Sequence, residues 1–139
     1  MMASLRNAVI SKLKTAFLDH KIYGEKVEQG LRKPCFFITV LPGDVIELNK
    51  LMQQREITID IQYLSEEETN AKNVEMADLL NDLFRSIAFD GLTVNIVERR
   101  FEIVDDILHF FLDLDFIVML SAAEQQDLMQ EIIHNREVL

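Results

Sequence analysis

The chain has 139 residues, of which 49% are hydrophobic and 27% are charged, and it carries a formal net charge of −10 at pH 7. This length and apolar content predict one folded domain, residues 1–139, rather than a disordered chain. The acidic balance argues against binding to nucleic acid phosphates or to an anionic membrane surface, because both need an excess of Lys and Arg.

The first third of the chain predicts one helix and two strands. Apolar residues recur every four positions over residues 4–18, which indicates an amphipathic helix. Residues 22–23 form a short predicted strand, and the apolar run 35–41 predicts a buried strand that ends at Pro42-Gly43. Residues 43–54 have no clear period, so we predict a loop or a loose hairpin arm there.

The middle of the chain predicts a strand, a helix and a second strand. Isoleucines alternate with polar residues over 56–63, which is typical of a half-buried strand. Ser65 begins a Ser-x-x-Glu capping-box pattern, which predicts a helix from there to about Ala88. Asp90-Gly91 is interpreted as the stop of this helix, and residues 92–97 as the next strand.

The last third predicts a hairpin and a helix. Strands at 101–104 and 107–119 flank a tight turn at Asp105-Asp106, where Asp tolerates positive φ. A second capping-box pattern predicts a C-terminal helix at about 121–137. This order of elements favours an α+β domain, a mainly antiparallel mixed sheet with helices packed on one face, but it leaves the strand order open.

Residues that could take part in catalysis or metal binding are few and scattered. His109, Asp113 and Asp115 share one face of the strand 107–119, and imidazole with carboxylates could bind a divalent cation. They spread over roughly 20 Å at about 3.3 Å per residue, so His109 and Asp115 cannot reach one ion. Cys35 lies in an apolar run, which predicts a buried thiol with a raised pKa. We therefore predict that the protein is not an enzyme and has no metal ion or cofactor.

Apolar surface beyond the needs of one chain is predicted at two places. The strand 107–119 is apolar on parts of both faces, whereas one layer of helices covers only one face. Either the C-terminal helix or a neighbouring subunit covers the other face. The segment 43–54 is either an ordinary connection or an arm that grips a neighbour. The candidate contact residues are Val45, Ile46, Leu48, Leu51, Met52, Phe111, Leu128 and Ile132.

Six segments, taken in order and spacing, resemble a known family. They are IYGE (22–25), VEQGL (27–31), KPCFFI (33–38), DIQYL (60–64), FEIVD (101–105) and LHFF (108–111). Over residues 4–119 the chain resembles the tail terminators of phages, prophage elements and tail-like bacteriocins of Gram-positive bacteria. It departs from that pattern at Asp106, where Gly is expected, and in a longer C-terminal helix.

The resemblance implies a tail-terminator-like fold and a structural role in a virion or tail particle, contractile tails and tailocins included, assembled in the bacterial cytoplasm. Subunits of that family form a hexameric ring that caps the tail tube, ends tube polymerisation and joins the head or a cap. The implied partners are further copies and the tail tube protein, with sheath and head–tail connector proteins as further candidates. Two alternatives stay open: another neck component that joins head and tail, and a small cytoplasmic ligand- or metal-binding domain.

Overall fold

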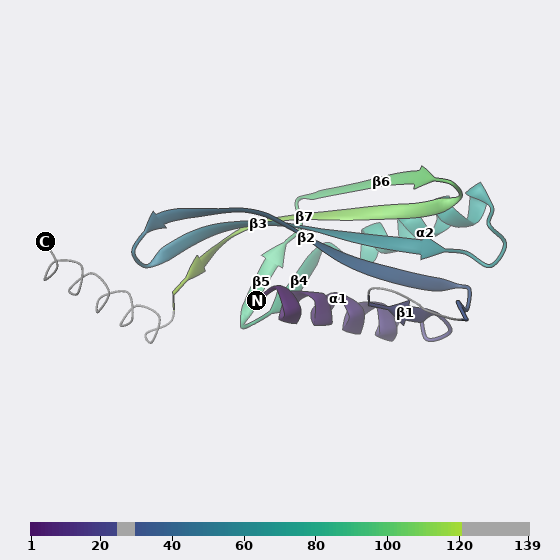
Figure 1. Cartoon of the computed structure of the whole chain (residues 1–139), viewed down its shortest axis with the longest axis horizontal. Helices are drawn as coiled ribbons and strands as arrows, with labels where there is room; N and C mark the ends of the chain where they lie inside the picture. Colours follow the sequence, from purple (N-terminus) through teal and green to yellow (C-terminus); the bar gives the residue numbers. More distant parts are fainter. Residues whose placement is uncertain (25–29, 121–139) are drawn as a thin grey trace, which may run out of the picture.

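The computed structural model describes residues 1–24 and 30–120. Within these residues the elements, in chain order, are α1 (Met2–Ala16), β1 (Lys21–Tyr23), β2 (Cys35–Asn49), β3 (Met52–Leu64), α2 (Asn70–Leu83), β4 (Ser86–Phe89), β5 (Leu92–Asn95), β6 (Glu98–Val104) and β7 (Ile107–Met119). Five strands form one sheet in the order β1-β2-β3-β7-β6, and β4 and β5 form a separate hairpin (Figure 1). β1 pairs with β2 in parallel and the other pairs are antiparallel, which confirms the mainly antiparallel α+β fold.

The core lies between one face of the large sheet and the helices. Leu5, Val9 and Leu13 of α1 are fully buried, which confirms the apolar stripe predicted from their four-residue spacing. They belong to one hydrophobic cluster with Leu80 of α2. The sheet contributes inward-facing residues of three strands to the same cluster: Phe36, Ile38, Ile57, Ile59, Ile61, Leu108, Phe110 and Leu112. Both helices therefore cover the same face, as the sequence predicts.

Two polar side chains connect the helices to their surroundings. Lys12 of α1 donates hydrogen bonds from Nζ to the carbonyl oxygens of Leu83 and Ser86, at 2.8 and 2.7 Å. The Leu83 carbonyl lies at the C-terminal end of α2, where backbone acceptors lack partners within the helix, and Ser86 is the first residue of β4. Asn73 of α2 donates from Nδ2 to the carbonyl oxygen of Asp106, at 2.9 Å. The turn between β6 and β7 is thereby fixed to α2.

The predicted helix from Ser65 to about Ala88 is wrong at both ends. The Ser65 hydroxyl accepts a hydrogen bond from the Glu68 amide at 2.9 Å, but Glu68 has a φ of 52°, so the chain turns before α2 begins. Thr69 is the residue that caps the helix, accepting from the Lys72 amide. Beyond Leu83 the inward residues alternate in the β4 strand, and Asp90-Gly91, both with positive φ, form a hairpin turn.

Of the two structures predicted for residues 43–54, a loop or a loose hairpin arm, the structure shows the hairpin arm. β2 continues through Pro42-Gly43 to Asn49 and pairs with β3 along its whole length. The pairing register shifts between Pro42 and Val45, where one extra residue on β2 forms a bulge. A Cβ on Gly43 would lie 2.6 Å from the Glu56 carbonyl oxygen, so the glycine permits a close approach of two strands. Pro42-Gly43 marks this bulge and not a strand end.

Two further predictions are confirmed, and a third lies outside the described residues. The hairpin of β6 and β7 is confirmed, with Asp105 and Asp106 at φ 51° and 64° in its turn. Cys35 is 0% exposed, and burial raises the pKa of its thiol, as predicted. The predicted C-terminal helix at about 121–137, with Leu128 and Ile132, lies outside the described residues, as do residues 25–29 of the resemblance.

Candidate subunit interface

Three strands of the large sheet extend well past the helices and form what we call the arm. It comprises residues 41–49 of β2, the turn at 50–51, 52–55 of β3 and 116–119 of β7. Figure 1 shows this three-stranded ribbon projecting from the body that carries α1 and α2. Every residue from Leu41 to Leu51 is exposed. The arm is therefore a structured extension whose two faces are both open in the described part of the chain.

Large apolar side chains are concentrated on the arm. Successive residues of a strand point to opposite faces, so Val45 and Ile46, at 51% and 44% exposure, make both faces apolar. The register places Ile46 on the same face as Ile117 of β7 through Gln54 of β3. The large apolar residues exposed on the arm are Leu41, Val45, Ile46, Leu48, Leu51, Ile117 and Met119.

Four of the predicted contact residues, Val45, Ile46, Leu48 and Leu51, are thus exposed together on one extension. Met52 is half-buried in the same ribbon. The candidate list omitted Leu41, Ile117 and Met119, because the pairing that brings β7 beside the arm is not visible along the sequence. The role of the predicted contact residues in a subunit interface stays a prediction.

The tip of the arm is held by its own hydrogen bonds. Asn49 accepts at Oδ1 from the Leu51 amide at 2.8 Å, an arrangement that mimics a backbone turn. The Leu120 amide donates to the Leu51 carbonyl oxygen at 2.8 Å, so the end of β7 is fixed to the same tip. Gln54 donates from Nε2 to Asp115 at 2.9 Å across the strands. These contacts make the arm an ordered surface rather than a loose connection.

Above the body, the sheet face opposite the helices carries two groups of polar side chains beside the half-buried Phe111. Nδ1 of His109 lies 3.1 Å from Oδ2 of Asp60, and Asp60 is only 8% exposed. Because β3 and β7 are neighbours, Gln62 stands directly across from His109. Further along this side of β7, the exposed apolar residues Ile117 and Met119 lie on the arm.

Arg100, Asp113 and Thr58 form a second polar group on the same face. Nε of Arg100 donates to Asp113 at 2.8 Å, and the Thr58 hydroxyl donates to the same carboxylate at 2.8 Å. These hydrogen bonds, first from Arg100, lower the pKa of the Asp113 carboxyl. The Arg100 guanidinium carbon also lies 4.9 Å from the ring centre of Phe111. The predicted contact residue Phe111 is therefore half-covered by its own neighbours.

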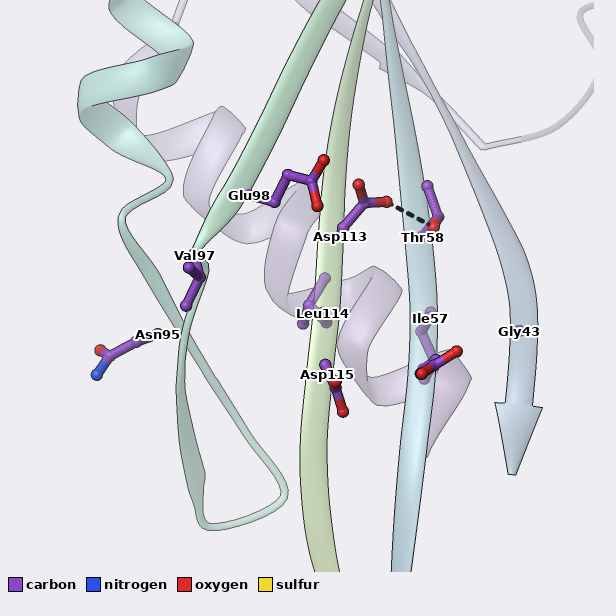
Figure 2. Close-up of a pocket in the computed structure, with 10 residues that line it drawn as sticks. Gly43, Ile57, Thr58, Asn95, Val97, Glu98, Asp113, Leu114 and Asp115 are labelled. Atoms are coloured by element: carbon purple, nitrogen blue, oxygen red, sulfur yellow. Dashed lines mark hydrogen bonds between the residues drawn. The ribbon is translucent and has the colours of Figure 1, made fainter. Parts of the chain in front are cut away.

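An acidic pocket of about 550 Å³ lies where the arm joins the body. Figure 2 shows Asp113 and Asp115 of β7 beside Glu98, with Ile57 and Thr58 of β3 nearby. Among the described residues no three His, Cys, Asp or Glu side chains are close enough to bind one metal ion. His109, Asp113 and Asp115, weighed above as ligands, instead face Asp60, Arg100 and Gln54.

None of the helices in residues 1–24 and 30–120 is long and apolar enough to cross a membrane.

Comparison with known proteins identifies the family. The mixed sheet with helices on one face defines an α+β protein, and the family model for phage tail terminator proteins matches residues 4–126. The chain belongs to the phage tail terminator family. It is therefore a structural component of a phage-type tail, from a family of structural proteins and not of enzymes.

Two further comparisons were made, and one of them gives information on the fold. No curated protein matches the chain. A solved structure has a TM-score of 0.51 at 11% sequence identity, covering 86% of this chain and 92% of that chain. At this identity the likeness supports the fold alone.

Proposed function

We propose that this chain forms a hexameric ring on the last ring of the tail tube, where it ends tube polymerisation and offers the surface that joins the head or, in a headless particle, a cap. Its partners are then further copies and the tube protein, with sheath and connector proteins as outer neighbours, and assembly takes place in the bacterial cytoplasm. The observation that carries the proposal is the arm, an ordered ribbon with apolar side chains exposed on both faces.

The energetics favour association through the arm. Burial of apolar surface contributes about 25 cal/mol per Å², and seven large apolar side chains of the arm are open to solvent. Monomeric proteins rarely leave apolar side chains gathered in this way. In a closed ring each subunit uses different patches on its two sides. An arm on one side of the body and a separate receiving surface on the neighbour meet that requirement.

Electron microscopy and gel filtration of the purified chain, alone and mixed with tail tubes, test the proposal. The expected result is a hexamer-sized ring, bound at one end of each tube, with no further growth of capped tubes on addition of tube protein. A chain that stays monomeric in both conditions, with tubes that keep growing, would contradict it.

A pull-down distinguishes the terminator from another neck component. A terminator binds the tube end directly, so the purified chain should retain tubes of the tube protein without any third protein. If retention requires a connector protein, the chain is a joining protein further from the tube.

A further inference from the structure

The two sides of the body carry opposite charge. α1, β1 and the residues just before β2, 1–24 and 30–34, contain six basic residues and one acidic residue, a net side-chain charge of +5. α2 and β6 with its turn, residues 70–83 and 98–106, contain three basic and seven acidic residues, a net charge of −4. β1 and β6 are the outer strands of the large sheet, and Figure 1 shows α1 with β1 on one side of the body and β6 on the other. We call these two sides the basic edge and the acidic edge.

Three side chains of the basic edge are available to a partner. Lys14 of α1, Lys21 of β1 and Arg32 are exposed, and none of them forms a salt bridge with the described part of the chain. Lys12 and Lys33 are engaged within the chain, by backbone carbonyl oxygens and by a carboxylate. The positive charge that a neighbour can meet is therefore carried by Lys14, Lys21 and Arg32.

Apolar side chains lie beside these charges on α1. Ile10, Lys14 and Leu18 line one depression on the solvent side of the helix, and Leu18 is 85% exposed. No carboxylate is among the described residues that line this depression, and Asp19 is the one acidic residue of the segment 1–24. The basic edge thus combines exposed apolar surface with positive charge.

The acidic edge has exposed apolar side chains of its own. Phe101 and Ile103 pair in register with Phe110 and Leu108, so they share the sheet face that packs against the helices. Their two partners are buried, whereas Phe101 is 56% exposed and Ile103 is 39% exposed. The core therefore ends at β7, and β6 presents its helix-side residues to solvent.

α2 adds Val74 to the same patch. Arg99 of β6 donates from Nε to Oδ1 of Asn81 at 2.9 Å, so the side of α2 that carries Asn81 faces β6. Val74 precedes Asn81 by seven residues, about two helical turns, and therefore lies on that side too. Val74 is exposed, and so is Asp78, one turn further along the helix. The patch, which we call the β6 patch, comprises Val74, Phe101 and Ile103.

Carboxylates surround the β6 patch. Asp78, Glu102 and Asp105 are exposed, and none of them has a salt bridge to a described residue. The two arginines of β6 are engaged elsewhere, Arg99 by an Asn side chain of α2 and Arg100 by a carboxylate of β7. The acidic edge is therefore an apolar patch with a negatively charged rim.

We propose that the basic edge of one copy packs against the acidic edge of the next copy in the ring. The exposed apolar residues of α1 then meet the β6 patch, and the three available basic side chains face the three free carboxylates. An apolar centre with a polar rim is the usual composition of a protein interface. The inference rests on the proposed ring and names the surfaces that close it.

The charges also select the direction of assembly. In a two-fold contact between like edges, basic residues would face basic residues or carboxylates would face carboxylates. Packing of opposite edges avoids this repulsion and, repeated around an axis, gives the heterologous contact of a closed ring. The arm does not compete for these surfaces, because it extends from the ends of the strands and the edges lie at their sides (Figure 1).

Charge reversal on each edge tests the contact. The basic-edge variant is Lys14→Glu with Lys21→Glu, the acidic-edge variant is Asp78→Lys with Glu102→Lys, and a third chain carries all four substitutions. Each two-residue variant should raise by about tenfold or more the protein concentration at which half of the chains are in rings, because like charges then face each other. The chain with all four substitutions has opposite edges again, so it should form rings within about threefold of the wild-type concentration. Gel filtration over a dilution series measures this concentration.

Net charge alone cannot produce this pattern. The acidic-edge variant reduces the net charge from −10 to −6, since each substitution adds +2, and this change would favour association if overall repulsion were limiting. Exchange of an ion pair elsewhere on α2, Lys72→Glu with Glu75→Lys, is the control and should assemble as the wild type does. Two-residue variants that assemble normally, or a defect that the four-residue chain does not repair, would overturn the contact.

Zero-length cross-linking identifies the surfaces directly. A carbodiimide joins a lysine amine to a carboxylate in contact with it, and rings assembled from equal parts of isotope-labelled and unlabelled chain distinguish links between copies from links within one copy. Mass spectrometry should find mixed-isotope links from Lys14 or Lys21 to carboxylates of α2 or β6. Mixed-isotope links from these lysines only to carboxylates of the arm, such as Asp44, or none from them at all, would overturn the contact.

The outcomes separate this inference from the function on which it rests. Wild-type rings that show neither the reversal pattern nor the cross-links keep the proposed function and overturn the contact between the edges. If the wild-type chain forms no ring, alone or with tail tubes, the proposed function fails and the contact fails with it.

Discussion

Asn73 is a polar side chain buried without any exposure in the helix layer, and it holds the β6–β7 turn through the Asp106 carbonyl. We expect Asn73→Ala to lower the free energy of unfolding by about 0.5–1.5 kcal/mol, because it removes the hydrogen bond that fixes the β6–β7 turn to α2. Urea denaturation of the two proteins measures this difference.

Asn7→Ala is the control for that substitution. Asn7 is exposed on α1, so its removal should change the free energy of unfolding by less than about 0.5 kcal/mol. Equal effects at Asn7 and Asn73 would show that the contact with Asp106 contributes nothing.

His20 packs among aromatic rings, with centroids 5.4, 5.4 and 5.9 Å from those of Phe17, Phe36 and Tyr63. Burial lowers the pKa of its imidazole below the ordinary value of 6.5. The unfolded chain then binds a proton more readily than the folded chain, so stability falls as the pH drops below about 6.5.

His20→Phe should reduce this loss of stability, because it keeps the aromatic contacts and removes the titrating group. Urea denaturation of both proteins at pH 7 and pH 5 gives the comparison, and all other titrating groups are shared. The lowered pKa of Asp113 affects stability only at more acidic pH, below its ordinary value of 3.8. An equal loss in both proteins between pH 7 and pH 5 would refute the role of His20.

At the scale of single residues, the sequence predicts the environment of a side chain correctly where that environment is set by its neighbours along the chain. The buried Cys35 follows from its apolar neighbours, and the turn at Asp105-Asp106 follows from two Asp residues between strands. The surroundings of His109 could not be read in the same way. Its partner Asp60 is 49 residues away and meets it only through the register of β3 and β7.

At the scale of elements, the β2–β3 hairpin depends on the bulge at Gly43. A Cβ there would lie 2.6 Å from the Glu56 carbonyl oxygen, so the backbone would have to move to relieve the clash. We expect Gly43→Ala to speed amide hydrogen exchange severalfold over residues 44–54, with the amides of α1 unchanged. Asp44→Ala, one residue further and exposed, is the control and should leave exchange near the wild-type rate. Unchanged exchange in Gly43→Ala would mean that the bulge tolerates a side chain.

Two of the errors in the predicted elements, at Pro42-Gly43 and at Asp90-Gly91, have the same cause. Pro42-Gly43 and Asp90-Gly91 are strong local signals, but each is compatible with more than one structure. Pairing with β3 converts the first into a bulge, and pairing of β4 with β5 converts the second into a hairpin turn. Which structure forms is decided by partners distant in sequence, so periodic segments such as α1 and residues 56–63 are predicted far better than the connections.

At the scale of the whole molecule, the body and the arm differ in what stabilises them. The body encloses its own core, whereas the arm exposes apolar residues on both faces. We therefore expect the double variant Ile46→Lys and Ile117→Lys to keep the free energy of unfolding within about 0.5 kcal/mol of wild type and to abolish ring formation in gel filtration. Val97→Lys, at a residue that is 92% exposed and outside the arm, should assemble normally. Rings of the double variant would exclude this face of the arm from the interface.

The outer edge of β2 has a consequence for chains that have not yet met a partner. An open strand edge invites further strands to add, and identical chains can extend such an addition into fibrils. On this edge Pro42 has no amide hydrogen to donate, and Asp44 and Glu47 place negative charge along the same few residues. These features of β2 oppose the addition of further strands along this edge of the free chain.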